Sequence, residues 1–88
     1  MIKLRLFAAL RELAGSKEVE VEGGSIKEAL ERFAEQFGER ARGILFDKQG
    51  SVQPSVLLLV NGEPAHQGGA TRVNSGDTVA VLLPTAGG

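Results

Sequence analysis

The chain ends in two glycines, Gly87 and Gly88, which leave its terminal carboxylate on a stem with almost no side chains. Glycine has no Cβ atom, so such a stem can enter a narrow groove and let the backbone of a partner approach closely. We expect Ala86 and Gly87 to be the threading residues and Gly88 to present the reactive carboxyl group. An ordinary frayed terminus has a similar composition, so the other motifs of the chain must decide between the two interpretations.

The side chains that usually carry catalysis are scarce in this sequence. It contains no cysteine, which excludes disulfides, thiolate zinc sites and cysteine nucleophiles. His66 is its one histidine, so a metal site would need carboxylates plus a single imidazole, and we expect no metal. No serine lies in a G-x-S-x-G motif, and neither common phosphate-loop motif occurs. We therefore predict a protein that is not an enzyme by itself and binds no cofactor.

Length and charge limit the fold and the partners. The 88 residues suffice for one domain. Ten basic and eleven acidic residues give a net charge of −1, and Trp and Tyr are absent, so we expect neither nucleic acid nor a membrane surface as a partner. No apolar run approaches the roughly 18 residues of a membrane span, and the first residues lack the layout of a signal peptide. We expect a cytoplasmic protein.

Two segments near the start alternate between apolar and charged residues, as half-buried strands do. In residues 2–6 the charges are basic, Lys3 and Arg5, and in residues 18–22 they are all glutamate. Pairing these strands as an antiparallel hairpin would bring the opposite charges together. The connection between them, residues 8–17, is too long for a tight turn, so we expect a short helical turn in it that ends at Gly15.

The clearest helix signal follows. Ser25 and Glu28 form a capping box, the apolar residues behind them recur at helical spacing as far as Phe37, and Gly38 is a plausible stop. We expect a loop over residues 39–54, in which residues 44–46 tuck under one edge of the fold and residues 47–51 are mobile.

The second half of the chain reads as strands. The continuous apolar run over residues 56–60 predicts a strand buried on both faces or nearly so, and Asn61-Gly62 predicts a turn after it. Residues 78–83 form a second apolar strand. The order of these elements predicts an α+β, β-grasp (ubiquitin-like) domain over residues 1–83, with one main helix packed across a mixed sheet of about five strands. The first and last strands would be central parallel neighbours, and residues 84–88 would form a flexible Gly-Gly tail.

Four motifs in order support a family assignment: LFAALRELAG over residues 6–15, VNG over residues 60–62, GDTVA over residues 76–80, and the terminal Gly87-Gly88. Together they resemble the MoaD/ThiS family of ubiquitin-like sulfur carriers, and the resemblance covers essentially the whole chain. The long segment before Val56 resembles the extended MoaD type, including archaeal small modifier proteins. The stretch over residues 68–71 is also similar to CysO-like carriers.

The resemblance implies a chemistry for the chain end. A MoeB- or ThiF-like adenylyltransferase would use ATP to adenylate the carboxylate of Gly88, and sulfur transfer would then produce a thiocarboxylate. The favoured destination is molybdenum cofactor biosynthesis, with this chain as the small subunit of molybdopterin synthase and the large subunit as sulfur acceptor. Alternatives are a CysO-like sulfur donor to a cysteine synthase or another metabolite pathway, thiolation of transfer RNA, and a ubiquitin-like modifier conjugated to lysines of target proteins. A β-grasp interaction module whose tail is never activated is the rival class.

Four residues are candidates for partner docking, namely Phe7, Arg11, Leu82 and Pro84, and for Arg11 and the approach to the tail the resemblance is what suggests it. Phe7 breaks the alternation of the first strand, so it either fills the far side of the sheet or joins a docking patch, and we favour packing in the core or at the sheet edge. Arg11 is equally compatible with a solvated helical turn that has no role. The approach to the tail, Leu82-Leu83-Pro84-Thr85, departs from the Phe-Pro-Pro-Val pattern of many MoaD proteins, which weakens the case for molybdopterin synthase as the partner.

Overall fold

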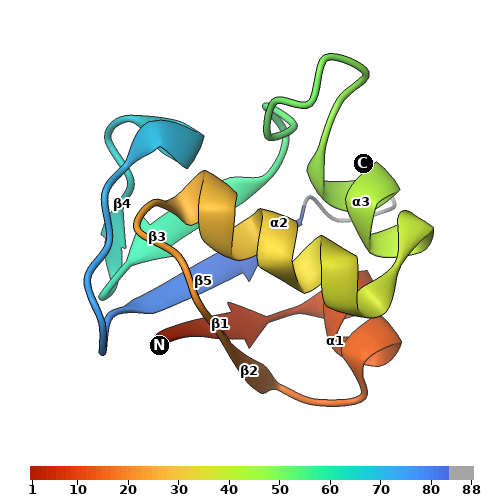
Figure 1. Ribbon diagram of the computed structural model, residues 1–88, viewed down its shortest axis with the longest axis horizontal. Helices are drawn as coiled ribbons and strands as arrows, with labels where there is room; N and C mark the ends of the chain where they lie inside the picture. Colours follow the sequence, from red (N-terminus) through yellow and green to blue (C-terminus); the bar gives the residue numbers. More distant parts are fainter. Residues whose placement is uncertain (84–88) are drawn as a thin grey trace.

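The computed structural model describes residues 1–83 of the chain, and the main helix crosses one face of a mixed sheet (Figure 1). The strands lie in the order β2-β1-β5-β3-β4. Their bounds are β1 Ile2–Leu6, β2 Glu18–Val21, β3 Leu57–Val60, β4 Glu63–Pro64 and β5 Thr78–Leu82. The helices are α1 Ala8–Ala14, α2 Ile26–Phe37 and α3 Glu39–Leu45, with a 3-10 turn, η1, at Gly68–Ala70. This architecture confirms the predicted β-grasp, including the central parallel pair formed by β1 and β5.

Strand β1 shows the predicted alternation. Its apolar residues are at most 2% exposed and face α2, whereas Lys3 and Arg5 are on the open side of the sheet. Strand β2 pairs with β1 in antiparallel register, with Arg5 opposite Glu18. Both basic side chains reach that glutamate, Arg5 Nε at 3.5 Å and Lys3 Nζ at 4.0 Å. Exposed pairs of this kind contribute about 0–1 kcal/mol each, so they help to set the register more than the stability.

Helix α1 confirms the helical turn predicted between the first two strands. It ends at Gly15, whose φ of 71° is left-handed and whose N–H donates to the carbonyl of Arg11 at 2.9 Å. It begins under strain, because Ala8 has a φ of 51°, a region that alanine disfavours. The kink there turns the chain out of β1 directly after Phe7.

Helix α2 begins at the predicted capping box. The Glu28 N–H donates to Ser25 Oγ at 3.2 Å, and the Glu28 carboxylate accepts from the Gly24 N–H at 2.8 Å. Five apolar residues of α2 are buried against the sheet, and Gly38 ends the helix as predicted. Gly23 lies so close to α2 that a Cβ there would be 2.8 Å from the backbone nitrogen of Ala29. The glycine therefore lets the chain pass directly under the helix.

The loop predicted for residues 39–54 was wrong in its first half, which forms α3. Gly38, at a φ of 94°, both ends α2 and precedes α3, so the chain changes direction and resumes a helix at once. Ala41 and Leu45, four residues apart, are fully buried and anchor this helix. Leu45 and Phe46 are tucked into the core as predicted. Over residues 47–51, the Asp47 carboxylate accepts two backbone N–H bonds that shape a turn, while the predicted mobility there stays a prediction.

Strand β3 corrects a second prediction, because its apolar run is not buried on both faces. Leu58 is 6% exposed, but the preceding Leu57 is 55% exposed. The helices cover only one face of the sheet, so alternate residues of β3 point to the open side. The turn at Asn61-Gly62 is confirmed, and φ values of 51° and 88° suit the tight connection from β3 to β4.

Within residues 1–83, no helix has the length and apolar character needed to cross a membrane.

Candidate functional site

The open side of the sheet carries an apolar surface over strands β3 and β5. Register places Leu57 opposite Leu82 and Leu59 opposite Ala80, and directly opposed residues share a face. Phe7, half-buried, lies beside the same shallow groove of about 430 Å³, together with Leu59 and Leu82. We call this surface the outer patch. It consists of Phe7, Leu57, Leu59, Ala80 and Leu82.

The outer patch has a basic side. Arg5 lines the same groove, and its register partner in β5 is Ala80. The Arg5 side chain is 54% exposed, and it shares the Glu18 carboxylate with Lys3. Strand β2, which carries that glutamate, is at the edge of the sheet, and β1 separates it from the patch. A partner that covers the patch therefore meets apolar side chains first and a guanidinium at the rim, the arrangement typical of protein interfaces.

The position of the patch follows from the topology. Strand β5 is central in the sheet, flanked by β1 and β3, and Leu82 is its last residue. The chain then continues toward Gly88, six residues after Leu82 in the sequence. Six residues span at most about 20 Å when extended, so a protein that covers the patch also covers the point from which the terminal segment departs.

The opposite end of the groove is held by a polar network around Asp77. One carboxylate oxygen accepts from the Asn74 N–H at 2.8 Å and the other from the Asn61 amide at 3.1 Å. These hydrogen bonds, that from Asn74 first, hold the pKa of Asp77 below its ordinary value of 3.8. Asn61 Oδ1 in turn accepts from the Thr78 N–H at 3.0 Å. The network joins the β3–β4 turn to the start of β5 and fixes the two strands that carry most of the patch.

The structure brings together some of the predicted docking residues and separates others. Phe7 and Leu82 line one groove. Phe7 is half-buried on the open side of the sheet and lies outside the buried core, so the favoured core packing was wrong, while its role in docking stays a prediction. Arg11 is exposed on α1 and does not line this groove. Pro84, Ala86, Gly87 and Gly88 lie outside the described residues.

Sequence reasoning missed Leu57, Leu59 and Ala80 as members of the patch. The signal was present in the continuous apolar run over residues 56–60. Such a run is typical of a strand with two covered faces, but the helices of residues 1–83 cover only one face of the sheet. The uncovered half of the run is therefore available for an interface.

Comparison with known proteins decides the family. The model of the ThiS family matches residues 4–88, which includes the outer patch and the terminal glycines. This chain belongs to the ThiS family. It is 38% identical over 95 residues to small archaeal modifier protein 3 of Haloferax volcanii, an alignment that covers 99% of this chain and 98% of the relative.

Solved structures of other members agree with this assignment. The solution structure of small archaeal modifier protein 1 from Methanosarcina acetivorans superposes with a TM-score of 0.87 at 26% identity, covering 99% of this chain and 95% of the other. The crystal structure of the Amycolatopsis orientalis BexX/CysO complex matches at a TM-score of 0.81 and 25% identity, over the full length of both chains. The predicted resemblance to ThiS-type carriers, archaeal modifiers and CysO is thereby confirmed. The proteins to which this chain is similar are small ubiquitin-like carriers and modifiers.

Proposed function

We propose that this ThiS-family protein is a sulfur carrier whose Gly88 carboxylate is activated by a MoeB- or ThiF-like adenylyltransferase. The carboxylate attacks the α-phosphate of ATP and releases pyrophosphate, which gives an acyl-adenylate. A sulfur nucleophile then displaces AMP from the carbonyl carbon and leaves a thiocarboxylate. The outer patch supports this proposal most directly, because an apolar docking face adjoins the strand that delivers the chain end.

The proposal divides the chemistry between the two proteins. The proposal assigns the binding of ATP to the adenylyltransferase and the sulfur atom to a separate donor. This chain contributes a carboxyl group on a stem without bulky side chains and a surface that holds it in place. A chain without cysteine can therefore take part in sulfur transfer.

Molybdopterin synthesis, with this chain as the small subunit of the synthase, is the first destination to test. Leu82 stands where many MoaD proteins have an aromatic residue, and the fold matches CysO as closely as it does several archaeal modifiers. A cysteine synthase-like acceptor is therefore tested alongside the large subunit of molybdopterin synthase. Incubation of the thiocarboxylated protein with each acceptor separates the two, since sulfur is consumed only with the correct one.

A modifier role is the second candidate, and the 38% identity to small archaeal modifier protein 3 favours it. In that role, the amine of a target lysine attacks the activated carbonyl of Gly88, an isopeptide bond forms and the activating group leaves. Expression of the tagged chain in a host with the activating enzyme should then yield target peptides that carry a Gly-Gly remnant after proteolysis. Recovery of the thiocarboxylate without any such conjugate favours the carrier role instead.

The decisive experiment measures intact mass after incubation with ATP, a sulfur donor and the activating enzyme. The expected change replaces one oxygen atom by one sulfur atom. Gly88→Val should abolish it while circular dichroism remains native, and Thr85→Val serves as the matched control because it places the same side chain three residues earlier. Normal activation of Gly88→Val would refute the threading argument. No change of mass with any cognate activator would support an interaction module that is never activated.

A further inference from the structure

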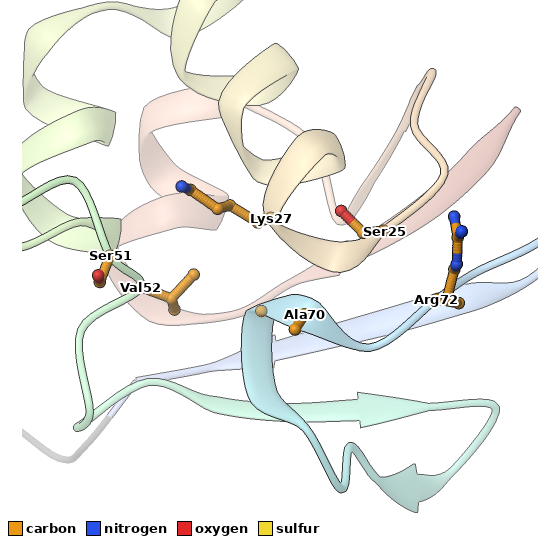
Figure 2. A pocket seen from close by; sticks show the side chains of 7 residues that line it. Ser25, Lys27, Ser51, Val52, Ala70 and Arg72 are labelled. Atoms are coloured by element: carbon orange, nitrogen blue, oxygen red, sulfur yellow. The ribbon is translucent and has the colours of Figure 1, made fainter.

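A second groove lies on the helix side of the sheet, opposite the outer patch. It has a volume of about 410 Å³ and opens between the start of α2, the segment around Val52, and η1 (Figure 2). Its lining includes Lys27 and Arg72, which lie toward its two ends: in Figure 2, Lys27 is beside Val52, and Arg72 is beyond Ala70. The volume falls within the range of roughly 300–1,000 Å³ that is typical of binding pockets.

The groove is held in shape by backbone contacts. The Ile26 N–H donates to the carbonyl of Thr71 at 3.0 Å, and the Val73 N–H donates to that of Gly24 at 3.1 Å. On the floor, a Cβ at Gly69 would lie 2.9 Å from a methyl carbon of Val52. The two hydrogen bonds tie the segment that follows η1 to the start of α2, and the close approach at Gly69 places η1 against the segment around Val52.

The charge of the groove is one-sided. No acidic residue is among those that line it. The ion pairs found over residues 1–83 involve Lys3, Arg5 and Arg32, so neither Lys27 nor Arg72 has an acidic partner within 4.0 Å there. The Ser25 hydroxyl caps α2, and the Glu28 carboxylate accepts from the Gly24 N–H at 2.8 Å and offsets the positive end of that helix, so the charge of the groove comes from Lys27 and Arg72. The lining of the groove therefore contains two cations and no carboxylate.

We propose that this groove binds an acidic segment of a partner protein, with carboxylates at Lys27 and Arg72 and an apolar side chain over Val52. Two cations separated by an apolar floor match a peptide that alternates acidic and apolar residues. Nucleic acid fits less well, because the groove lacks an aromatic side chain for stacking. The groove and the outer patch lie on opposite faces, so the carrier can hold an acidic partner while its activating enzyme occupies the patch. This inference does not depend on activation of Gly88.

The test uses the full chain labelled with ¹⁵N and an acetylated hexapeptide of alternating glutamate and leucine. Titration should shift the amide resonances of Lys27, Val52, Gly69 and Ala70, with smaller effects on β1 and β5. The double variant Lys27→Gln, Arg72→Gln should bind roughly three- to thirty-fold more weakly, as expected for the loss of two exposed charge pairs. Both side chains are exposed, so the variant should fold normally.

Three controls make the test decisive. The double variant Lys17→Gln, Arg40→Gln removes the same charges at exposed positions outside the groove and should bind like the wild type. The matched glutamine–leucine peptide should not shift the groove resonances, and inorganic phosphate alone should not reproduce the shifts. Equal binding of the glutamine peptide, equal weakening in both double variants, or saturation by phosphate alone would each overturn the proposal.

Discussion

The outer patch can be tested with two adjacent leucines of β3 that differ in the face to which they point. Leu58 is 6% exposed and packs in the core, whereas Leu57 is 55% exposed on the patch. Truncating a buried leucine to alanine typically costs about 2–5 kcal/mol, because the transfer free energy is lost and a cavity remains. More than half of Leu57 is already in water, so Leu57→Ala should lower the free energy of unfolding by about 1 kcal/mol or less.

Activation should show the opposite order. If the activating enzyme covers the patch, Leu57→Ala removes apolar contact area between the two proteins. We then expect the KM of the enzyme for the variant to be roughly five- to thirty-fold higher than for the wild type, equivalent to about 1–2 kcal/mol of binding. Leu58→Ala does not alter the patch, so the enzyme should activate this variant with a nearly normal KM under conditions in which the variant is folded. A domain of this size retains a folded majority after a loss of about 3 kcal/mol in most cases.

The assays follow from the composition. The chain has no Trp or Tyr, so urea unfolding is best followed by far-ultraviolet circular dichroism, and activation by ATP–pyrophosphate exchange with the purified adenylyltransferase. Equal destabilisation by both substitutions would refute the assignment of the two leucines to opposite faces. An unchanged KM for both Leu57→Ala and Leu82→Ala would leave the faces correct but refute the patch as the docking surface.

Three further predictions concern the scaffold. Gly23→Ala should lower the free energy of unfolding by about 1–3 kcal/mol in urea titrations, because its Cβ would collide with α2. In the control Gly43→Ala, the new Cβ meets nothing within 4 Å, so that variant should be more stable by up to about 1 kcal/mol. An equal loss of stability in both variants would contradict the close approach at Gly23. Ala8→Gly should leave the thermal midpoint unchanged or raise it, because the φ of 51° at this position suits glycine. Ala9→Gly in the same helix should instead lower the free energy of unfolding by about 0.5–1 kcal/mol. A similar loss of stability in both variants would argue against backbone strain at Ala8. The lowered pKa of Asp77 means that its carboxylate stabilises the fold above its ordinary pKa of 3.8 and that this contribution is lost as pH falls through the lower folded value. The stability difference between wild type and Asp77→Asn should therefore narrow below pH 3.8, and a difference independent of pH would exclude the carboxylate as its source.

Most of the scaffold could be predicted from local pattern. The alternation in β1, the capping box at Ser25 and the turn at Asn61-Gly62 are each encoded within a few residues, and each local preference agrees with the global fold. Helix α3 was missed because its seven residues supply only two fully buried apolar positions, Ala41 and Leu45. Such a short helix is stabilised by its tertiary contacts and leaves little periodic signal.

The outer patch was harder to predict, because it depends on which face of the sheet remains uncovered. A run of leucines has the same appearance whether both its faces are buried or one is an interface. Phe7 was a candidate because it breaks the alternation of its strand, and Leu82 was one through family resemblance. Leu57 and Leu59 could be assigned only once the structure showed which face of the sheet the helices cover. The cationic groove between Lys27 and Arg72 joins residues that are 45 positions apart in the sequence, and no local pattern links them.

The apolar side chains on the open face of the sheet favour unwanted association, and their position next to the terminal segment suggests why they are there. Leucines that are exposed, like Leu57, or partly exposed, like Leu59 and Leu82, promote association of a small domain and are normally avoided unless they serve an interface. Here they lie on the strand from which the terminal segment departs and on the strand beside it. Docking at the patch would hold the terminal carboxyl within about 20 Å of a bound partner. That confinement converts the encounter of Gly88 with an active site into an effectively intramolecular event, at an effective concentration on the order of millimolar. Under the proposed function, activation gains its rate from this proximity, so loss of the patch should weaken activation even when the sequence of the tail is unchanged.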